Sequence, residues 1–332
     1  MDSAKSSDTA QIIYVGGTGR SGTNLLKDLL SGDASVYALP FEHRILIDPE
    51  GLVNFYHSFS SAWSPYMADL KIRRLKKFLF RLGNETRLRS LLGNMIDFFG
   101  SGKQMAGPRY HGWNLAKTFP DYFVEVEKLV DEFVEFDYAG KWPGSSSYSI
   151  RPKILHHSPM SKDEIASKIG TFINQLVAKC LQDQGKSVFV EDNTWNILFA
   201  EELLSFTNQS KLIHIYRHPR DVIASLIQQR WAPQDVVYAA NWYKDVMLQW
   251  LHVRNQVPRE RVFELRFENL IHEPLGALED LSVFTSLDLA PLADTIDQSK
   301  AHVGRWTKDL TKSQINLIEP VIAPLEQELG YA

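Results

Sequence analysis

The sequence predicts an α/β fold in which a parallel sheet is flanked by helices and carries a largely helical insertion. The first observation is the apolar, β-branched run at 12–15, which precedes a glycine-rich turn and a helical pattern from Thr23. Such a run is typical of a buried parallel strand. Strand and helix patterns alternate again after residue 186, whereas the segment from about 50 to 185 shows mainly helical apolar spacing.

The chain has 332 residues, and no linker rich in Pro, Gly or Ser divides it. We therefore expect one domain over 11–332, with the helical insertion at about 50–185. Residues 1–10 are polar, lack an apolar signal core and predict a flexible N-terminus.

The composition argues against several classes of partner. A net charge of −4 does not favour nucleic-acid binding, and no run approaches the roughly 20 apolar residues of a membrane span. A single cysteine, Cys180, cannot form an internal disulfide and suits a reducing compartment. The expectation is a cytoplasmic protein without stable membrane insertion, and its oligomeric state stays open.

The glycine-rich turn after the first strand predicts an anion site. Its glycines let the backbone approach an anion, and free N–H groups at the following helix start point at it. Arg20 adds positive charge within the turn, and Ser21, Thr23 and Asn24 add side-chain donors.

Three interpretations of this turn compete. The spacing Gly17-x-Gly19-x-x-Gly22, with Glu42 twenty residues on, fits a dinucleotide-binding fingerprint. An ATP- or GTP-binding loop is disfavoured because Thr23-Asn24 stands where that motif has Lys followed by Ser or Thr. The run from Arg20 to Thr23 also resembles the loop with which sulfotransferases bind phosphoadenosyl phosphosulfate (PAPS). The turn by itself leaves the first and third interpretations open.

A second group of polar residues follows the next expected strand, 36–39. Glu42, His43 and Arg44 come just past its end, where α/β sheets place their chemistry. Glu42 is a candidate base, and the alternative is a surface ion pair between Glu42 and Arg44.

The second half predicts further strands at 187–190, 211–216 and 261–265, with helices between and after them. Arg217 follows the strand at 211–216, and Ser225 lies about two turns into the next helix. The two residues can share one anion, or Arg217 can pair with Asp221 while Ser225 merely permits close packing. We expect the last helical stretch, 311–329, to break at Pro320 and Pro324.

Two other features of the middle segment are less specific. Basic residues recur between 71 and 89 along an apolar stripe, which suits an acidic substrate, a membrane surface or an ordinary solvated helix face. His156-His157 has no Cys or acid nearby at ligand spacing, so we expect no metal site.

Four separate segments of the chain match the motifs of one protein family, in the same order. They are Gly19–Leu26, Tyr216–Ser225, Leu265–Pro274, and Gly304–Trp306 followed by Val321–Pro324 and Leu329–Tyr331. Together they resemble the PAPS-dependent sulfotransferase family, and the ending is similar to that of the tyrosylprotein sulfotransferases and their bacterial relatives. The resemblance covers 11–47 and about 186–331, and it favours PAPS over a dinucleotide in the glycine-rich turn.

The resemblance implies a P-loop-like sheet and assigns roles to individual residues. Arg20 stands at the place of the catalytic cation, and Glu42 at that of the base, with His43 in reserve. Arg217 and Ser225 match the pair that binds the 3′-phosphate. The residues expected to bind the co-substrate are therefore Gly19, Arg20, Ser21, Gly22, Thr23, Asn24, Arg217, Ser225 and Arg305.

Two departures from the family pattern stand out. Many relatives have a Lys followed by Ser or Thr where this chain has Asp192-Asn193-Thr194, and the spacing from Arg20 to Glu42 is one residue longer than in the tyrosylprotein group.

The expected function is metal-independent sulfuryl transfer from PAPS to a hydroxyl of a small-molecule, glycan or peptide acceptor. The nucleotide product is PAP, which is PAPS without its sulfuryl group. The alternatives are an NAD(P)-binding oxidoreductase and a non-catalytic nucleotide-binding protein of the same fold.

Overall fold

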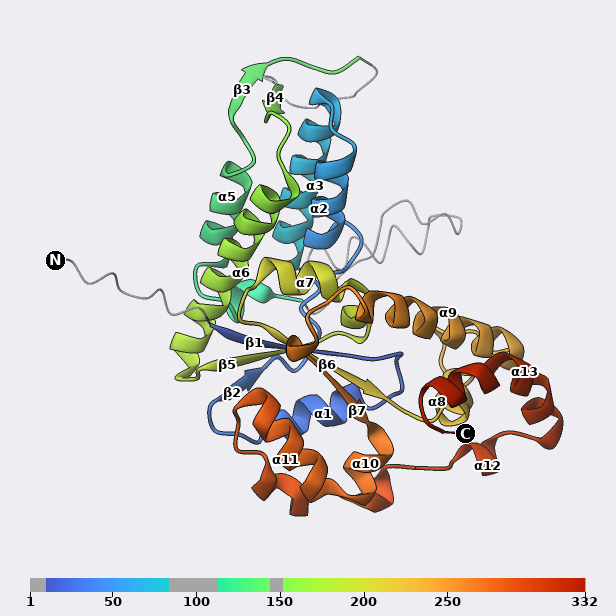
Figure 1. Ribbon diagram of the computed structural model, residues 1–332. Helices are drawn as coiled ribbons and strands as arrows, with labels where there is room; N and C mark the ends of the chain where they lie inside the picture. The colour runs from blue at the N-terminus through green and yellow to red at the C-terminus, as the bar shows by residue number, and fades with distance from the viewer. Residues whose placement is uncertain (1–9, 84–112, 144–151, 332) are drawn as a thin grey trace, which may run out of the picture. The chain divides into compact units, whose positions relative to one another are not determined.

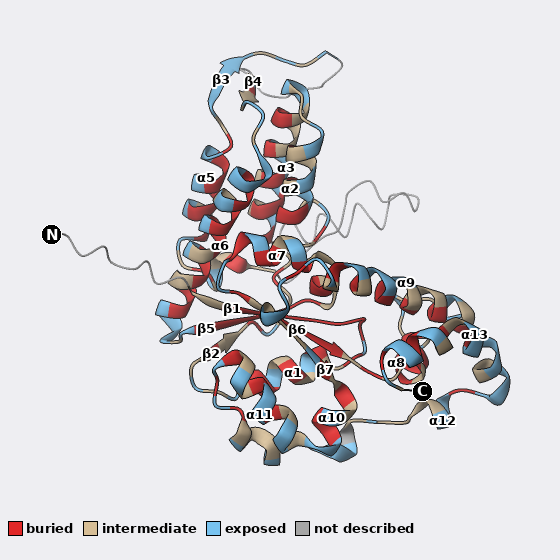
Figure 2. Cartoon of the chain, viewed as in Figure 1, coloured by how far each residue is buried: buried red, intermediate tan, exposed pale blue. Residues whose placement is uncertain are grey.

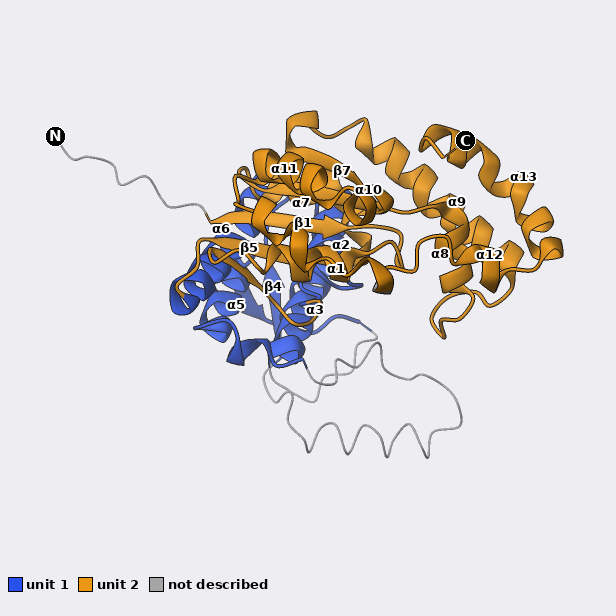
Figure 3. Cartoon of the chain, turned by 90° about the horizontal axis from the view of Figure 1, so that it is seen from below, with its two compact units in different colours: residues 1–9, 43–184 blue, residues 10–42, 185–332 orange. Residues whose placement is uncertain are grey.

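The computed structural model describes residues 10–83, 113–143 and 152–331. It divides into two compact units, one formed by 10–42 and 185–332 and the other by 43–184 (Figure 3). The expected flexible segment 1–10 lies outside the described residues except for Ala10, and so does the part of the basic stretch 71–89 that follows Gly83. The prediction of one domain with an insertion at about 50–185 stays a prediction.

The first unit, 10–42 with 185–332, contains the parallel sheet that the sequence predicts (Figure 1). Its strand order is β2-β5-β1-β6-β7, and every neighbouring pair is parallel. The central strands are buried almost throughout (Figure 2), because their Ile and Val side chains are covered on both faces. The strands are β1 (Gln11–Gly16), β2 (Val36–Ala38), β5 (Val188–Asp192), β6 (Lys211–Tyr216) and β7 (Val262–Arg266).

Helices cover both faces of this sheet. Leu26 of α1, Leu270 of α10 and Leu278 of α11 join one apolar cluster with the strands, on the side where Figure 1 draws these helices. The helices α7, α8, α9 and α13 form the other packed group. The helices of this unit are α1 (Thr23–Leu30), α7 (Ala200–Phe206), α8 (Pro219–Leu226), α9 (Val236–Arg254), α10 (Phe267–His272), α11 (Pro274–Thr285), α12 (Trp306–Asp309) and α13 (Lys312–Glu328).

One expectation about this unit is wrong, because α13 runs unbroken through Pro320 and Pro324. Both prolines are exposed, as is Asn316, so the carbonyl groups that the prolines leave without N–H partners face water. The buried face of the helix, with Ile318 and Ile322, packs on α9 and keeps the helix together. Tertiary packing therefore outweighs the local cost of two prolines.

The second unit, 43–184, is largely helical within its described residues. Its helices are α2 (Leu52–Ser61), α3 (Pro65–Gly83), α5 (Tyr122–Asp131) and α6 (Lys162–Gln184), and α3, α5 and α6 pack in sequence around a core of Leu, Ile and Phe side chains. Ser161 and Glu164 form a capping interaction at the start of α6.

A small antiparallel hairpin, β3 (Phe136–Ala139) with β4 (Lys153–His156), completes the second unit. Buried Asp69 of α3 fastens this hairpin. Its carboxylate accepts hydrogen bonds from Leu155 N at 2.9 Å and from Trp142 Nε1 at 2.9 Å. Two strands alone bury little apolar surface, so such a polar anchor is what holds them to the helix.

Candidate active site

The turn between β1 and α1 has the backbone of an anion-binding loop. Gly19 (φ 74°), Arg20 (φ 60°) and Gly22 (φ 109°) all adopt left-handed conformations. Gly22 is also the N-cap of α1 and supplies no side-chain cap, so the first N–H groups of that helix are left for a ligand. A Cβ at Gly22 would lie 2.5 Å from the Phe267 ring, and one at Gly17 would lie 2.1 Å from Ser21 Oγ. Side chains are excluded at both positions.

A pocket of about 250 Å³ opens beside this loop, within the unit that holds the sheet. It gathers residues from five separate parts of the sequence: the loop with the start of α1, the end of β6, helix α8, helix α10 and the segment before α12. The lining residues are Arg20, Gly22, Thr23, Asn24, Leu25, Arg217, Ser225, Phe267, Asp297, Ala301, His302 and Arg305. The structure thus brings Arg20, Gly22, Thr23, Asn24, Arg217, Ser225 and Arg305 to one place, and Gly19 and Ser21 belong to the same loop.

Three guanidinium groups converge on this pocket. Burial, and then the positive charges of Arg305 and Arg217, lower the pKa of Arg20. The Nε of Arg20 donates to Ser225 Oγ at 2.9 Å. Asp221 pairs with Arg217 and Asp309 pairs with Arg305, but the three positive charges still repel one another, and a bound anion would relieve this repulsion. The pocket is therefore suited to a ligand with more than one negative charge.

Arg217 is held rigidly while it lines the pocket. One of its terminal nitrogens donates to Asp221 Oδ2 at 3.2 Å and to the carbonyl of His302. Its guanidinium lies over the Phe267 ring, 4.7 Å from the centroid. The Nε of Arg217 is buried and has no hydrogen-bond partner among the described residues. The pairing with Asp221 thus orients Arg217 and coexists with its place in the pocket.

Asp221 is an organising residue that the sequence analysis named only as a possible partner of Arg217. Its side chain is fully buried, and it accepts hydrogen bonds from Gly304 N at 2.8 Å and from Trp306 N at 3.0 Å. These bonds fix the segment that carries Arg305, whose own guanidinium also pairs with Asp309 at 2.6 Å. The i, i+4 spacing of Arg217 and Asp221 was the available signal, but the link to 304–306 spans 83 residues.

Asp192, at the end of β5, forms an acidic position beside the helix that starts at the loop. Burial raises the pKa of Asp192 to about 6; the charge of Lys27 opposes this shift, and the charge of Glu42 adds to it. Lys27 Nζ lies 4.0 Å from Asp192 Oδ2, and Oδ1 is buried without a hydrogen-bond partner among the described residues. The candidate base Glu42 and Asp192 are therefore electrostatically coupled.

His43 is buried, whereas the neighbouring Glu42 is partly exposed. Its Nδ1 accepts the N–H of Ile45 at 3.1 Å, and its ring meets the edge of Phe119. Burial, followed by the charge of Arg44, lowers the pKa of His43 to about 3. The imidazole is consequently neutral at pH 7 and a weak base.

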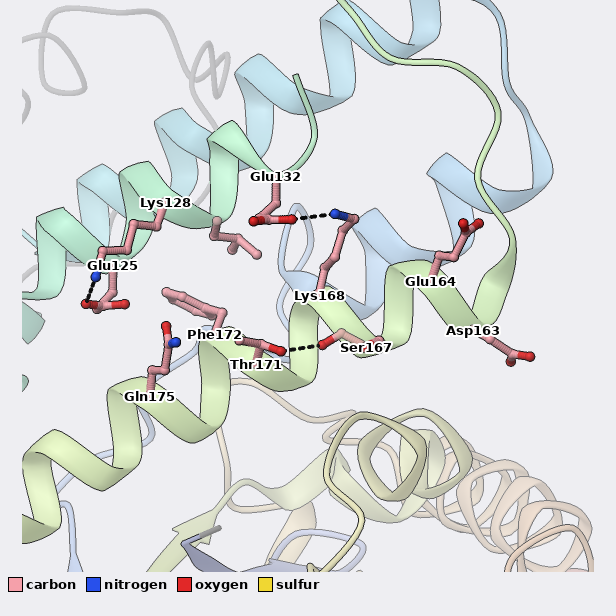
Figure 4. A pocket seen from close by; sticks show the side chains of 11 residues that line it. Glu125, Lys128, Glu132, Asp163, Glu164, Ser167, Lys168, Thr171, Phe172 and Gln175 are labelled. Atoms are coloured by element: carbon pink, nitrogen blue, oxygen red, sulfur yellow. Dashed lines mark hydrogen bonds and ion pairs between the residues drawn. The ribbon is translucent and has the colours of Figure 1, made fainter. Parts of the chain in front are cut away.

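A larger cavity, of about 730 Å³, lies in the helical unit between α5 and α6 (Figure 4). Its lining contains both acidic and basic side chains, and several of them pair with each other: Lys168 with Glu132, and Lys128 with Glu125 at 2.9 Å.

Among the described residues, no group of three His, Cys, Asp or Glu side chains is placed to hold a metal ion. None of the described helices is both long enough and apolar enough to span a membrane.

Comparison with known proteins identifies the family. The model of the sulfotransferase family matches residues 12–291, and no curated protein matches the chain. The sulfotransferase domain of the curacin biosynthetic pathway aligns with 14% identity over 96% of this chain and 98% of its own, with a TM-score of 0.47. The sulfotransferase domain of the Synechococcus PCC 7002 olefin synthase aligns with 15% identity over 94% of this chain and 86% of its own, with a TM-score of 0.42. Sulfotransferase STF9 from Mycobacterium avium aligns with 14% identity over 96% of this chain and 77% of its own, with a TM-score of 0.43. Because these structural similarities are weak, the assignment rests on the family model: the chain belongs to the sulfotransferase family.

Proposed function

We propose that the protein transfers a sulfuryl group from PAPS to a hydroxyl group of its acceptor. The observation that carries this proposal is the convergence of Arg20, Arg217 and Arg305 on a pocket beside a left-handed glycine-rich loop. PAPS carries a phosphosulfate and a separate 3′-phosphate, so it needs anion-binding groups at two points. The loop and the arginines beside it provide groups of this kind.

The loop residues Gly19 to Asn24 are proposed to hold the phosphosulfate through the free N–H groups at the start of α1. Arg217 and Ser225 are proposed to bind the 3′-phosphate, and Arg305 to be a further phosphate ligand. The buried, unpartnered Nε of Arg217 fits this role, because a bound phosphate can accept its hydrogen bond. Fixing the 3′-phosphate holds the donor in line for attack.

In the proposed reaction the acceptor oxygen forms a bond to sulfur while the bond from sulfur to the phosphate oxygen breaks. Negative charge develops on the leaving phosphate of PAP, and the guanidinium of Arg20 stabilises it. The acceptor proton goes to a general base. Glu42 is the proposed base, because it stands at the place of the family's acid and its charge acts on Asp192 at the end of β5, and His43 is the reserve candidate.

Several finer features belong to this proposal. The sulfuryl group carries less negative charge than a phosphoryl group, so the proposed chemistry is metal-independent. The acceptor is a small molecule, a glycan or a peptide, and the protein acts in the cytoplasm as expected from its composition. The position of the family's lysine is taken by Asp192-Asn193-Thr194, so Arg20 is the cation to which we assign the leaving-group role.

Transfer of radiolabel from ³⁵S-labelled PAPS to a panel of phenols, sugars and tyrosine peptides tests the proposal. Labelled product from at least one acceptor is expected, and it should disappear in Arg20→Ala. Binding of PAP without transfer to any acceptor class would favour the non-catalytic alternative. Tight binding of NADPH in place of PAP would favour the oxidoreductase.

A further inference from the structure

A tryptophan lies exposed beside the loop that we assign to the phosphosulfate. Trp231 belongs to the segment 227–235 between α8 and α9, and 54% of its surface is accessible. Large aromatic side chains are usually much more buried, so an exposed one is informative when it lies beside a reactive site.

The indole of Trp231 lies directly over Gly19. A Cβ built on Gly19 would be 3.0 Å from the Cη2 atom of Trp231 and 3.5 Å from the Cγ2 atom of Thr194. Gly19 neighbours Arg20, whose side chain reaches Ser225. The exposed indole therefore lies against the residue that directly precedes Arg20, the proposed catalytic cation.

Other residues of the same unit hold Trp231 in place. Its ring is tilted against that of Trp242, with centroids 5.8 Å apart, and Trp242 meets Trp195 edge-on at 5.4 Å. Gln229, two residues before Trp231, donates from Nε2 to the carbonyl of Ser225 at 3.2 Å. An aromatic ring supported in this way offers a pre-formed surface, and a ligand that stacks on it loses little free energy in ordering the protein.

We propose that Trp231 is the stacking platform for the acceptor and that the acceptor presents a ring with a broad apolar face, an aromatic ring or a pyranose, next to its reacting hydroxyl. This inference rests on the proposed function, because it places the sulfuryl group at the loop of Gly19. The attacking oxygen has to come within bonding distance of that group, so the acceptor's body must lie close to the loop. A ring of this kind gains both buried area and ring contact from the indole, whereas an open-chain alcohol gains only part of the area.

The test measures binding to protein saturated with PAP, by isothermal titration calorimetry. The probes are 2-naphthol for an aromatic ring, methyl β-D-glucopyranoside for a pyranose and 1-hexanol for an open chain. The variants are Trp231→Leu, which removes the ring, and Trp231→Phe, which keeps one. Tyr238→Leu on α9 is the matched control, because Tyr238 is an aromatic residue with 70% of its surface exposed.

At least one ring probe is expected to bind the wild type and Trp231→Phe, and to bind Trp231→Leu at least tenfold more weakly, a loss of about 1.4 kcal/mol. The control and the affinity for PAP should be unchanged. Preference for 2-naphthol indicates an aromatic acceptor, and preference for the glucoside indicates a sugar. Equal ring binding by wild type and Trp231→Leu, or no ring binding at all, overturns the inference. If either of these results is accompanied by normal PAP binding, the inference about Trp231 fails and the proposed donor site is unaffected. If the wild-type protein does not bind PAP, the proposed function itself is refuted.

Discussion

Replacing Asp192 with asparagine should change how the stability of the protein depends on pH. The carboxyl group has a pKa of about 6 in the folded protein and 3.8 as the reference value, because it is buried near Glu42. Its stabilising contribution is therefore complete below pH 3.8 and is lost as the pH rises through about 6. The total loss is about 3 kcal/mol, at about 1.4 kcal/mol for each pKa unit, and roughly half of it falls between pH 5 and pH 8.

Asparagine cannot ionise, so the variant escapes this loss. The free energy of unfolding of Asp192→Asn, measured relative to that of the wild type, should therefore rise by about 1.5 kcal/mol from pH 5 to pH 8. Urea unfolding of both proteins at the two pH values measures this difference. Asp28→Asn is the matched control, because Asp28 also contacts Lys27 but its side chain is 74% exposed. A difference between Asp192→Asn and wild type that stays constant from pH 5 to pH 8 would refute the assignment of Asp192 as a buried acid of raised pKa.

Three further predictions concern the proposed roles. Arg217→Ala should weaken PAP binding by roughly 2–4 kcal/mol, since it leaves a charged group of the ligand without its partner; calorimetry showing wild-type affinity would remove Arg217 from the site. Arg20→Ala should lower kcat more than it weakens PAP binding, because its charge matters most as the leaving phosphate develops; an unchanged kcat with a raised donor KM would make it a binding residue only. Glu42→Gln should lose on the order of a hundredfold in kcat while still binding PAP, and His43→Asn should not; the reverse result would exchange their roles, and survival of both would place the base elsewhere.

The strands of the parallel sheet and most helices were predictable because their signals are local, whereas the hairpin of β3 and β4 was not predicted. The β-branched runs that predicted β1 and β6 occur where the sheet has its buried central strands. Helical spacing allowed Arg217 and Ser225 to share one anion, the family resemblance suggested this role, and both residues line one pocket with Arg20. The error at α13 arose because proline cost was judged locally, whereas the burial of Ile318 and Ile322 against α9 depends on the tertiary structure.

The features that the sequence did not reveal all depend on contacts between distant segments. Asp221 anchors Gly304 across 83 residues, and this contact is what brings Arg305 toward Arg20. Trp231 lies over Gly19 although more than 200 residues separate them. No periodicity or spacing encodes such contacts, because they arise when the sheet places the ends of β1, β5 and β6 side by side.

The most direct test of the central claim is a calorimetric comparison of PAP, 5′-AMP and NADPH with the wild-type protein. If Arg217 and Ser225 bind the 3′-phosphate, PAP should bind more tightly than 5′-AMP by about 2 kcal/mol or more, roughly thirtyfold, because only PAP carries that phosphate. NADPH should not compete with PAP. Equal affinity for PAP and 5′-AMP, or binding of NADPH in preference to both, would contradict a PAPS site.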